Sequence, residues 1–331
     1  MSDREIRFAT PGEEEKIIEF LRDNWDPNFS VVQSRELFDF LYAGRHGPNF
    51  VLALREGNVV GTLGLSYYDE TRTDVFLTLW RSVDTNPTTG IEMLKYVTNQ
   101  NFDSISSVGT RKEVLVFYKL LKFNTGAMDQ WVKISSQRGD FTILGNVVSD
   151  NIGKDASEAL GSIAEVSEFS PDCCYFKNPC EGSPYKSLKY LTDRYLNHPV
   201  YSYRVFEYSL NGAIENYFVT RTVKHAGSSA LRIVDCIAND LGLTAFARHL
   251  EELFSREHHE YADLYCLNMN EDDLRAGGFV RCSDVADVVV PNYFEPFLQE
   301  GEIKYYVTTL EHPCLYKGDG DADRPYRLEH S

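Results

Sequence analysis

Long apolar runs are absent from this chain of 331 residues, and no stretch approaches the roughly 20 apolar residues that a membrane-spanning helix needs. The first ten residues, MSDREIRFAT, lack the basic start and the apolar core of a signal peptide. These absences favour a soluble protein with no membrane partner, and we expect a cytoplasmic location. The 43% of hydrophobic residues is enough to bury two cores in a chain of this length.

Metal-binding patterns are also lacking. None of the seven cysteines pairs with another in a C-x-x-C motif, so the sequence predicts free thiols and no zinc site. Asp319, Asp321 and Asp323 have the D-x-D-x-D spacing with which a calcium-binding loop begins, but the glycine at the sixth position and the glutamate at the twelfth are missing. We therefore expect no metal. These acids can hold a substrate ammonium or hydroxyls, with Arg324 on a phosphate or carboxylate, or they can fasten the C-terminal tail to its domain.

Basic clusters are missing as well. The chain has 50 acidic and 33 basic residues, which gives a formal net charge of -17. Nucleic acids and anionic membranes bind proteins chiefly through Lys and Arg, so this charge argues against both as partners. A small substrate fits better, and a cationic amine fits the negative field best.

One order of elements occurs twice along the chain. Residues 1–135 read as a strand, two helices, a three-strand meander, a helix, a strand, a helix and a further strand. A proline-containing, irregular stretch follows, and the same order returns from residue 185. We predict an N-terminal domain over 1–150, a connecting segment over 151–184 and a C-terminal domain over 185–331. The predicted class is α/β with mixed sheets.

This order resembles the GCN5-related N-acetyltransferase (GNAT) superfamily, which implies tandem domains that each hold a mixed, centrally splayed sheet flanked by helices. The turn VDTNPTTGIEMLKYV stands where GNAT proteins hold the coenzyme A pyrophosphate in an R-x-x-G-x-G/A loop. Only Gly90 matches, since Pro87 and Glu92 replace the arginine and the second glycine. The resemblance implies coenzyme contacts from Val83, Thr88, Thr89, Gly90 and Ile91. Thr89 to Glu92 also reads as a capping box, which would begin a helix with or without a ligand.

A second local feature is FYKLLKF, residues 117–123, which resembles the FYEKLGF ending of the fourth GNAT helix. In many members its tyrosine points at the coenzyme sulfur, so the resemblance implies that Tyr118 donates a proton to the departing thiolate. A packing role for this ring, with its hydroxyl satisfied at the edge of the core, stays open. The reaction also needs an amine base, for which Asp84 is best placed, ahead of Glu70 and Asp74, although each can be a surface acid.

The second half resembles a family of two-domain GNAT-like proteins associated with bacterial surface-polysaccharide and amino-sugar assembly. The segments VTRTVKHAGSSALRIVDCIA, EYADLYC, AGGF, VPNYFEPF and YKGDGDADRP carry this resemblance, from about Thr192 to Pro325. It implies acceptor contacts from the C-terminal domain, with candidates Arg221, Asp235, Glu295, Asp319, Asp321, Asp323 and Arg324. The aromatic residues around Glu295 can equally be plain packing.

Three hypotheses follow for the function. The first is an N-acyltransferase, most simply an N-acetyltransferase, that uses acetyl-CoA or another acyl-CoA as co-substrate. We expect its acceptor to be an amino sugar that is linked to a nucleotide. The second is a non-catalytic GNAT-like binding module, which the altered phosphate loop favours. The third, aminoacyl transfer from tRNA by a tandem GNAT-like enzyme, is weakened by the charge of -17. The acyl group, the sugar, the active domain and the oligomeric state stay open.

Overall fold

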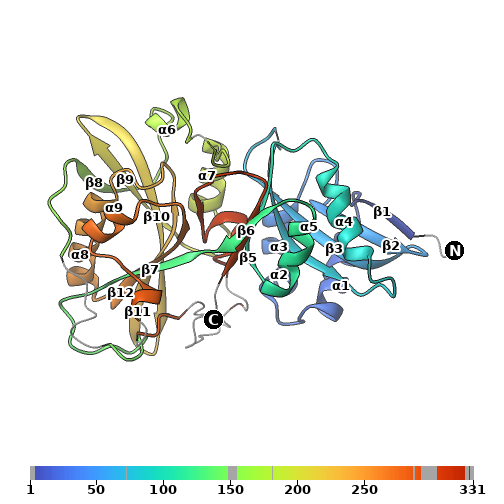
Figure 1. Ribbon diagram of the computed structural model, residues 1–331, viewed down its shortest axis with the longest axis horizontal. Helices are drawn as coiled ribbons and strands as arrows, with labels where there is room; N and C mark the ends of the chain where they lie inside the picture. The colour runs from blue at the N-terminus through green and yellow to red at the C-terminus, as the bar shows by residue number, and fades with distance from the viewer. Residues whose placement is uncertain are drawn as a thin grey trace.

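The computed structural model describes residues 4–71, 73–147, 155–180, 182–285, 288–291, 304–324 and 328. They form two lobes side by side, each built on one mixed β-sheet with helices on its faces (Figure 1). This arrangement confirms the predicted fold class. All seven cysteines carry free thiols. Within the described ranges, no helix combines the length and the apolar character that crossing a bilayer requires.

The first lobe contains most of the elements of the N-terminal half. Its helices are α1 (Glu14–Asn24), α2 (Ser30–Gln33), α3 (Arg35–Tyr42), α4 (Thr89–Thr98) and α5 (Leu115–Leu120). The strands of this half are β1 (Arg4–Phe8), β2 (Phe50–Arg55), β3 (Asn58–Tyr67), β4 (Asp74–Ser82), β5 (Ser104–Thr110), β6 (Asn124–Ala127) and β7 (Asp129–Ile134). The predicted cap of α3 is present, because Ser34 accepts a hydrogen bond from the Leu37 N–H at 3.1 Å.

Both faces of the first sheet are covered, and the sequence of β2 shows why. Successive side chains of a strand point to opposite faces. Phe50, Leu52 and Leu54 therefore pack with α1 and α3, whereas Val51 and Ala53 pack with α4 and α5. A run that is apolar at every position, such as FVLAL at residues 50–54, suits a strand that is buried on both sides.

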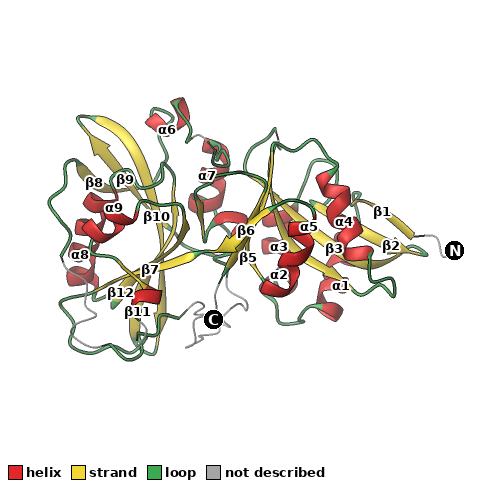
Figure 2. Cartoon of the chain, in the orientation of Figure 1, coloured by secondary structure: helices red, strands yellow, loops and turns green. Residues whose placement is uncertain are grey.

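The second lobe repeats this plan. Its helices are α6 (Cys174–Lys177), α7 (Leu188–Leu191), which a π-helical turn at Thr192–Leu196 extends, α8 (Leu243–Glu257) and α9 (Glu271–Ala276). The strands of this half are β8 (Ser162–Val166), β9 (Arg204–Leu210), β10 (Ala213–His225), β11 (Ser228–Cys236), β12 (Tyr261–Leu267), β13 (Val280–Arg281), β14 (Tyr305–Thr308) and β15 (Leu315–Tyr316). Figure 2 shows α8 and α9 on one side of this sheet and α7 toward the first lobe.

The two halves exchange one strand each. The first sheet has the order β1-β2-β3-β4-β5-β14-β6, and the second has the order β13-β7-β12-β11-β10-β9-β8. The further strand that was expected to end residues 1–135 is β7, which joins the second sheet, whereas β14 of the C-terminal half joins the first sheet. The expectation that each domain builds its own sheet was therefore wrong for these two strands. The chain leaves the first sheet after Ala127 and enters the second at Asp129, so β7 runs between the lobes in Figure 1. Neither sheet is confined to one side of the predicted connecting segment.

The C-terminal segment lies between the lobes and contacts both (red in Figure 1). Strand β15 pairs with β12, and the Gly318 N–H donates to the Val234 carbonyl of β11 at 2.8 Å. The following turn, Asp319–Asp321, lies against β4 and β5 of the first lobe. A Cβ atom at Gly320 would stand 3.1 Å from the Phe76 ring, and φ there is +59°, so glycine is the residue that this contact favours.

Candidate active site

Strand β4 carries a bulge at the point where it separates from β5. The two parallel strands pair only through residues 74–76 of β4 and 104–106 of β5. Further along, the register of β4 against β3 shifts between Thr62 and Gly64, and Leu79 has a φ of +46°. A positive φ is rare for leucine and marks a locally strained backbone. The first sheet is thus splayed and bulged at its centre, as the resemblance implies.

The Trp80 ring connects the two predicted ends of the coenzyme site. Trp80 is a bulge residue, and its ring lies 5.4 Å from the Tyr118 ring of α5 in an edge-to-face contact. A Cβ atom placed on Gly90, in the first turn of α4, would lie 3.5 Å from the same indole. The first turn of α4 and the Tyr118 ring of α5 therefore both lie against one aromatic side chain, on the α4 and α5 face of the sheet.

The Tyr118 side chain is buried, and no residue that the structure describes is hydrogen-bonded to its hydroxyl. Only 2% of the residue is exposed, and its ring also packs against Phe123 at 5.3 Å. Burial raises the pKa of this phenol above its ordinary value, so the hydroxyl keeps its proton at neutral pH. Among the described residues none accepts that proton in a hydrogen bond. The oxygen is not among the buried atoms that lack a partner, so it reaches the edge of the core, and the packing role for this ring stays open beside the proton-donor role.

The turn before α4 places the other predicted coenzyme residues. Val83 is 44% exposed, Thr88 is the N-cap of α4, and Thr89 is buried as its first residue. The predicted capping box from Thr89 to Glu92 was wrong, because Thr89 donates to the Asp84 carboxylate at 2.5 Å instead. Thr88, one residue earlier, donates to the carboxylate of Glu92.

Asp84 is the centre of an ion-pair network at the start of α4. Its side chain is 1% exposed and lies 2.5 Å from the Arg55 guanidinium and 3.7 Å from that of Arg4. Burial alone would favour the neutral acid, but the hydrogen bond from Thr89 and the two arginines outweigh it and lower the pKa of Asp84. Arg4 also pairs with Glu92. A carboxylate in such surroundings is a weak base.

The other two base candidates lie away from the bulge. Asp74 begins β4, five residues before Leu79, where it accepts hydrogen bonds from Ser104 and from the Tyr185 N–H. Burial raises the pKa of Asp74. Glu70 is exposed in the preceding turn. The geometry therefore brings Tyr118 and the start of α4 together, but it brings neither of these acids to them.

The predicted acceptor residues are gathered around the C-terminal tail. Asp319 accepts hydrogen bonds from Tyr68 at 2.9 Å and from the Tyr316 N–H at 2.7 Å, and it lies 2.8 Å from Lys186 Nζ. Lys186 also lies 2.6 Å from Asp235. All of these groups are buried, which suits the alternative in which the acids fasten the tail.

The remaining acids of the tail are paired with arginines. Asp321 lies 2.7 Å from Arg194 and 2.8 Å from Arg324, and Asp323 lies 2.6 Å from the same Arg194. Arg221 donates to the Asp323 carbonyl at 3.1 Å. Glu295 lies outside the described residues.

Sequence reasoning missed Lys186 and Arg194, the cations that hold these acids. The one available signal was indirect: an acid-rich segment that closes a fold needs buried cations, but nothing in the sequence says which ones. Both residues come from the segment before β9, far along the chain from the tail.

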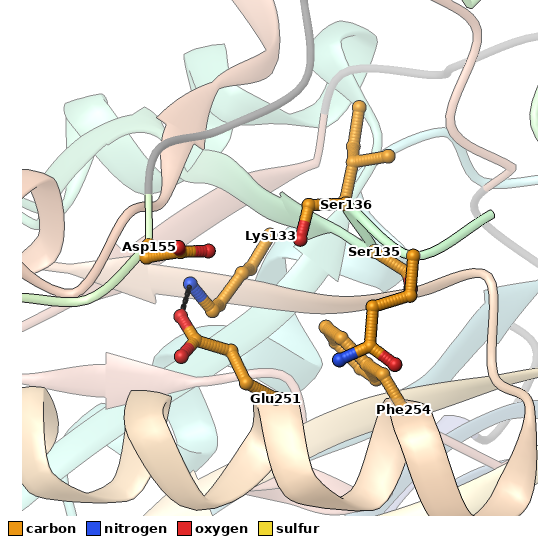
Figure 3. A pocket seen from close by; sticks show the side chains of 8 residues that line it. Lys133, Ser135, Ser136, Asp155, Glu251 and Phe254 are labelled. Atoms are coloured by element: carbon orange, nitrogen blue, oxygen red, sulfur yellow. Dashed lines mark ion pairs between the residues drawn. The ribbon is translucent and has the colours of Figure 1, made fainter. Parts of the chain in front are cut away.

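A small hollow lies between β7 and α8 (Figure 3). There Lys133 Nζ lies 2.7 Å from Glu251, whose same oxygen accepts a hydrogen bond from the Ala156 N–H at 2.7 Å. The buried Ser135 hydroxyl has no partner among the described residues. The hollow has a volume of about 10 Å³, which is enough for one water molecule and too little for an organic substrate.

Comparison with known proteins gives similarity in fold. No protein-family model and no curated protein matches the chain. A probable N-acyltransferase of unknown function from Enterococcus faecalis V583 is similar with a TM-score of 0.55 and 12% identity, over 93% of this chain and 73% of that one. A GCN5-related N-acetyltransferase from Anabaena variabilis ATCC 29413 is similar with a TM-score of 0.54 and 11% identity, over 92% and 72%. A putative acetyltransferase from Pyrococcus horikoshii has a TM-score of 0.50 and 12% identity, over 98% and 94%. The tandem GNAT-like fold is thus confirmed.

Proposed function

We propose that the protein is an acyl-CoA-dependent N-acyltransferase whose coenzyme site lies on the first lobe, between the start of α4 and the Tyr118 hydroxyl. The observation that carries this proposal is the bulge in β4, which stands where β4 and β5 separate and brings Trp80 against Tyr118. Acetyl-CoA is the simplest co-substrate. A direct transfer of this kind needs positioning and polarisation more than it needs a metal ion.

In the proposed reaction an uncharged amine attacks a thioester carbonyl, and the new C–N bond forms as the C–S bond breaks. The nitrogen gives up one proton to solvent water, the thiolate takes up one from Tyr118, and solvent returns a proton to the phenol. A bound acyl-CoA would supply the thioester. Tyr118 would supply the hydrogen bond or the proton, since it is protonated and its hydroxyl has no other acceptor among the described residues. Gly90 leaves the start of α4 free of a side chain, where helix N–H groups can meet a phosphate.

For Asp84 we propose a positioning role in place of the base. Its lowered pKa makes it a weak proton acceptor, but it joins Arg55, Arg4 and Thr89 at the start of α4. The residue would thus act on coenzyme binding through the shape of this turn.

The acceptor that we propose is an amino sugar, nucleotide-linked and used in surface-polysaccharide assembly. This part rests on the resemblance of the second half. The charge of -17 also suits an amine, which is cationic until it loses its proton to react. Thr78, beside the bulge, faces the α1 to α3 side of the sheet, where its hydroxyl lies 3.0 Å from that of Tyr42.

A non-catalytic binding module is the second candidate, and one observation favours it. The carboxylates of Asp84 and Glu92 lie at the start of α4, where a pyrophosphate would bind in an enzyme of this fold. These two carboxylates would repel the negative charge of a pyrophosphate. The positive charges of Arg4 and Arg55 offset these carboxylates. Whether the net charge at this turn permits a pyrophosphate to bind therefore decides between the two functions.

Calorimetric titration of the whole protein with acetyl-CoA tests the proposal. We expect binding at micromolar to millimolar concentration, and we expect Gly90→Val to weaken it by about tenfold or more, since branched carbons would crowd the N–H groups. Gly139→Val is the matched control, because Gly139 is exposed and a Cβ atom there meets nothing within 4 Å. No heat of binding at millimolar acetyl-CoA would favour the binding module.

A further inference from the structure

Three guanidinium groups and two carboxylates meet where the C-terminal tail crosses the first lobe. Arg194 pairs with both Asp321 and Asp323, and Arg324 pairs with Asp321. Arg221 donates to the Asp323 backbone carbonyl. The nearest further carboxylates, Asp319 and Asp235, are both bound to Lys186. Arg194 and Arg324 thus bring two guanidinium groups to the same turn.

Hydrogen-bond donors in the same place have no acceptor. Arg194 Nε, His198 Nε2 and the Tyr201 hydroxyl are buried atoms without a hydrogen-bond partner among the described residues. His198 Nδ1 accepts from the N–H groups of Val200 and Tyr201, at 3.2 and 3.0 Å, so Nε2 carries the hydrogen. Burial and the neighbouring Arg194 lower the pKa of His198 to about 3, so the ring is neutral at pH 7. Asp321 Oδ1, an acceptor in the same group, is also buried without a hydrogen-bond partner, so three such donors stand against one such acceptor. Buried donors without acceptors are rare and costly, and an oxyanion would supply the acceptors that this excess of donors lacks.

Aromatic rings link these donors to one another. The His198 and Tyr201 rings stack at 4.3 Å, and the Arg221 guanidinium lies 5.0 Å from the centre of the Tyr201 ring. Arg194 lies 5.1 Å from the centre of the Tyr203 ring, which itself contacts His198 at 5.8 Å. The group reaches solvent, because the Arg324 side chain is 12% exposed and Val200 is 37% exposed.

We propose that Arg194, Arg324, His198 and Tyr201 form a subsite for an oxyanion, a phosphate or a carboxylate, on the acceptor molecule. Its place in the fold supports this assignment. Arg324 lies 5.2 Å from the Phe29 ring centre and beside Tyr42, whose hydroxyl contacts Thr78, next to the bulge residue Leu79. An acceptor held by its anionic group here would have its amine near the bulge.

This inference deepens the proposed function, and it rests on that function only for the identity of the molecule that carries the oxyanion. The subsite itself belongs to the α1 to α3 face of the sheet, opposite Trp80 and Tyr118. Oxyanion binding can therefore be measured without any acyl-CoA, and a failure to bind acetyl-CoA would leave it standing.

The subsite can be tested by thermal unfolding and calorimetry of the whole protein. Both are done with inorganic phosphate, acetate or chloride at equal ionic strength. We expect phosphate or acetate to raise the midpoint of unfolding above the chloride value. A response to phosphate indicates a phosphate-bearing acceptor such as a nucleotide-linked sugar, and a response to acetate alone indicates a carboxylate. If neither differs from chloride, the proposal is wrong.

Tyr201→Phe is the decisive variant. It keeps the ring and its stacking, and it removes a hydroxyl that has no partner in the free protein, so the unfolding midpoint without ligand should not fall. Affinity for the oxyanion should fall about tenfold to hundredfold, the usual loss for a hydrogen bond to a charged group. Tyr203→Phe is the matched control: its hydroxyl already donates to Asp323 at 2.7 Å, so its loss should lower the midpoint even without ligand. Unchanged oxyanion affinity in Tyr201→Phe would refute the assignment.

Discussion

The Tyr118 hydroxyl can be tested by removing a single oxygen atom. In Tyr118→Phe the ring contacts with Trp80 and Phe123 remain, at 5.4 and 5.3 Å between ring centres. Because the hydroxyl makes no hydrogen bond with the described residues, its loss breaks none, and we expect the free energy of unfolding to change by less than about 0.5 kcal/mol. If the hydroxyl is the proton donor, kcat should fall roughly 10² to 10⁴-fold, or about 3 to 5 kcal/mol in the barrier.

Two measurements separate these effects. A thiol reagent detects the coenzyme thiol that is released, and this assay, run with a panel of amino sugars and other amines, gives kcat and the KM for acetyl-CoA. Urea unfolding gives the free energy of unfolding. Tyr68→Phe is the control, because its hydroxyl donates to Asp319 at 2.9 Å and accepts from the Gly320 N–H at 2.8 Å, so its loss should cost about 1 to 3 kcal/mol of stability. A folded Tyr118→Phe protein with near-normal kcat would refute the donor role.

Two further substitutions test the acids. Asp321→Asn leaves Arg194 and Arg324 with less buried negative charge, so we expect a loss of about 3 to 5 kcal/mol in urea unfolding; a stable variant with only a raised acceptor KM would instead show that Asp321 binds substrate. Asp84→Asn should cost about 1 to 3 kcal/mol at pH 7. Since the folded pKa of Asp84 lies below its unfolded value, the carboxylate stabilises the fold above pH of about 4, and the difference from the wild type should shrink as the pH falls through the folded pKa. A folded Asp84→Asn protein that keeps its stability but loses kcat by orders of magnitude would restore the base role.

The turn before α4 shows how far local reasoning reached. The T-x-x-E pattern correctly indicated that a helix begins near Thr89, and it was wrong about the cap by one residue. A capping box can be written from the sequence alone, but the competing partner of Thr89 is Asp84, which is fixed there by Arg4 and Arg55. Those arginines come from other strands, so the outcome depended on contacts that the local pattern does not contain.

The acids of the tail show the same limit at longer range. Their alternation and the glycine between them were visible in the sequence, and both readings, a substrate site or a fastening of the tail, were physically sound. The structure supplies Lys186 and Arg194 as partners, more than 120 residues earlier in the chain. The energy of a buried carboxylate depends on which cation the fold places beside it, and that placement is a property of the whole fold.

The local patterns of the amino-acid sequence determined the order and type of most elements and their repetition along the chain, and the resemblance to a known superfamily added the expectation of splayed sheets. The local patterns suffice for this order because helix and strand patterns depend on neighbours within a few residues. Only the tertiary structure decided that β7 and β14 change places between the sheets and that the tail between them packs against β4 and β5. A strand exposes the same row of N–H and C=O groups to any partner, so its sequence specifies that it is a strand without specifying which sheet will bind it. Which sheet each strand joins therefore depends on how the two lobes pack together.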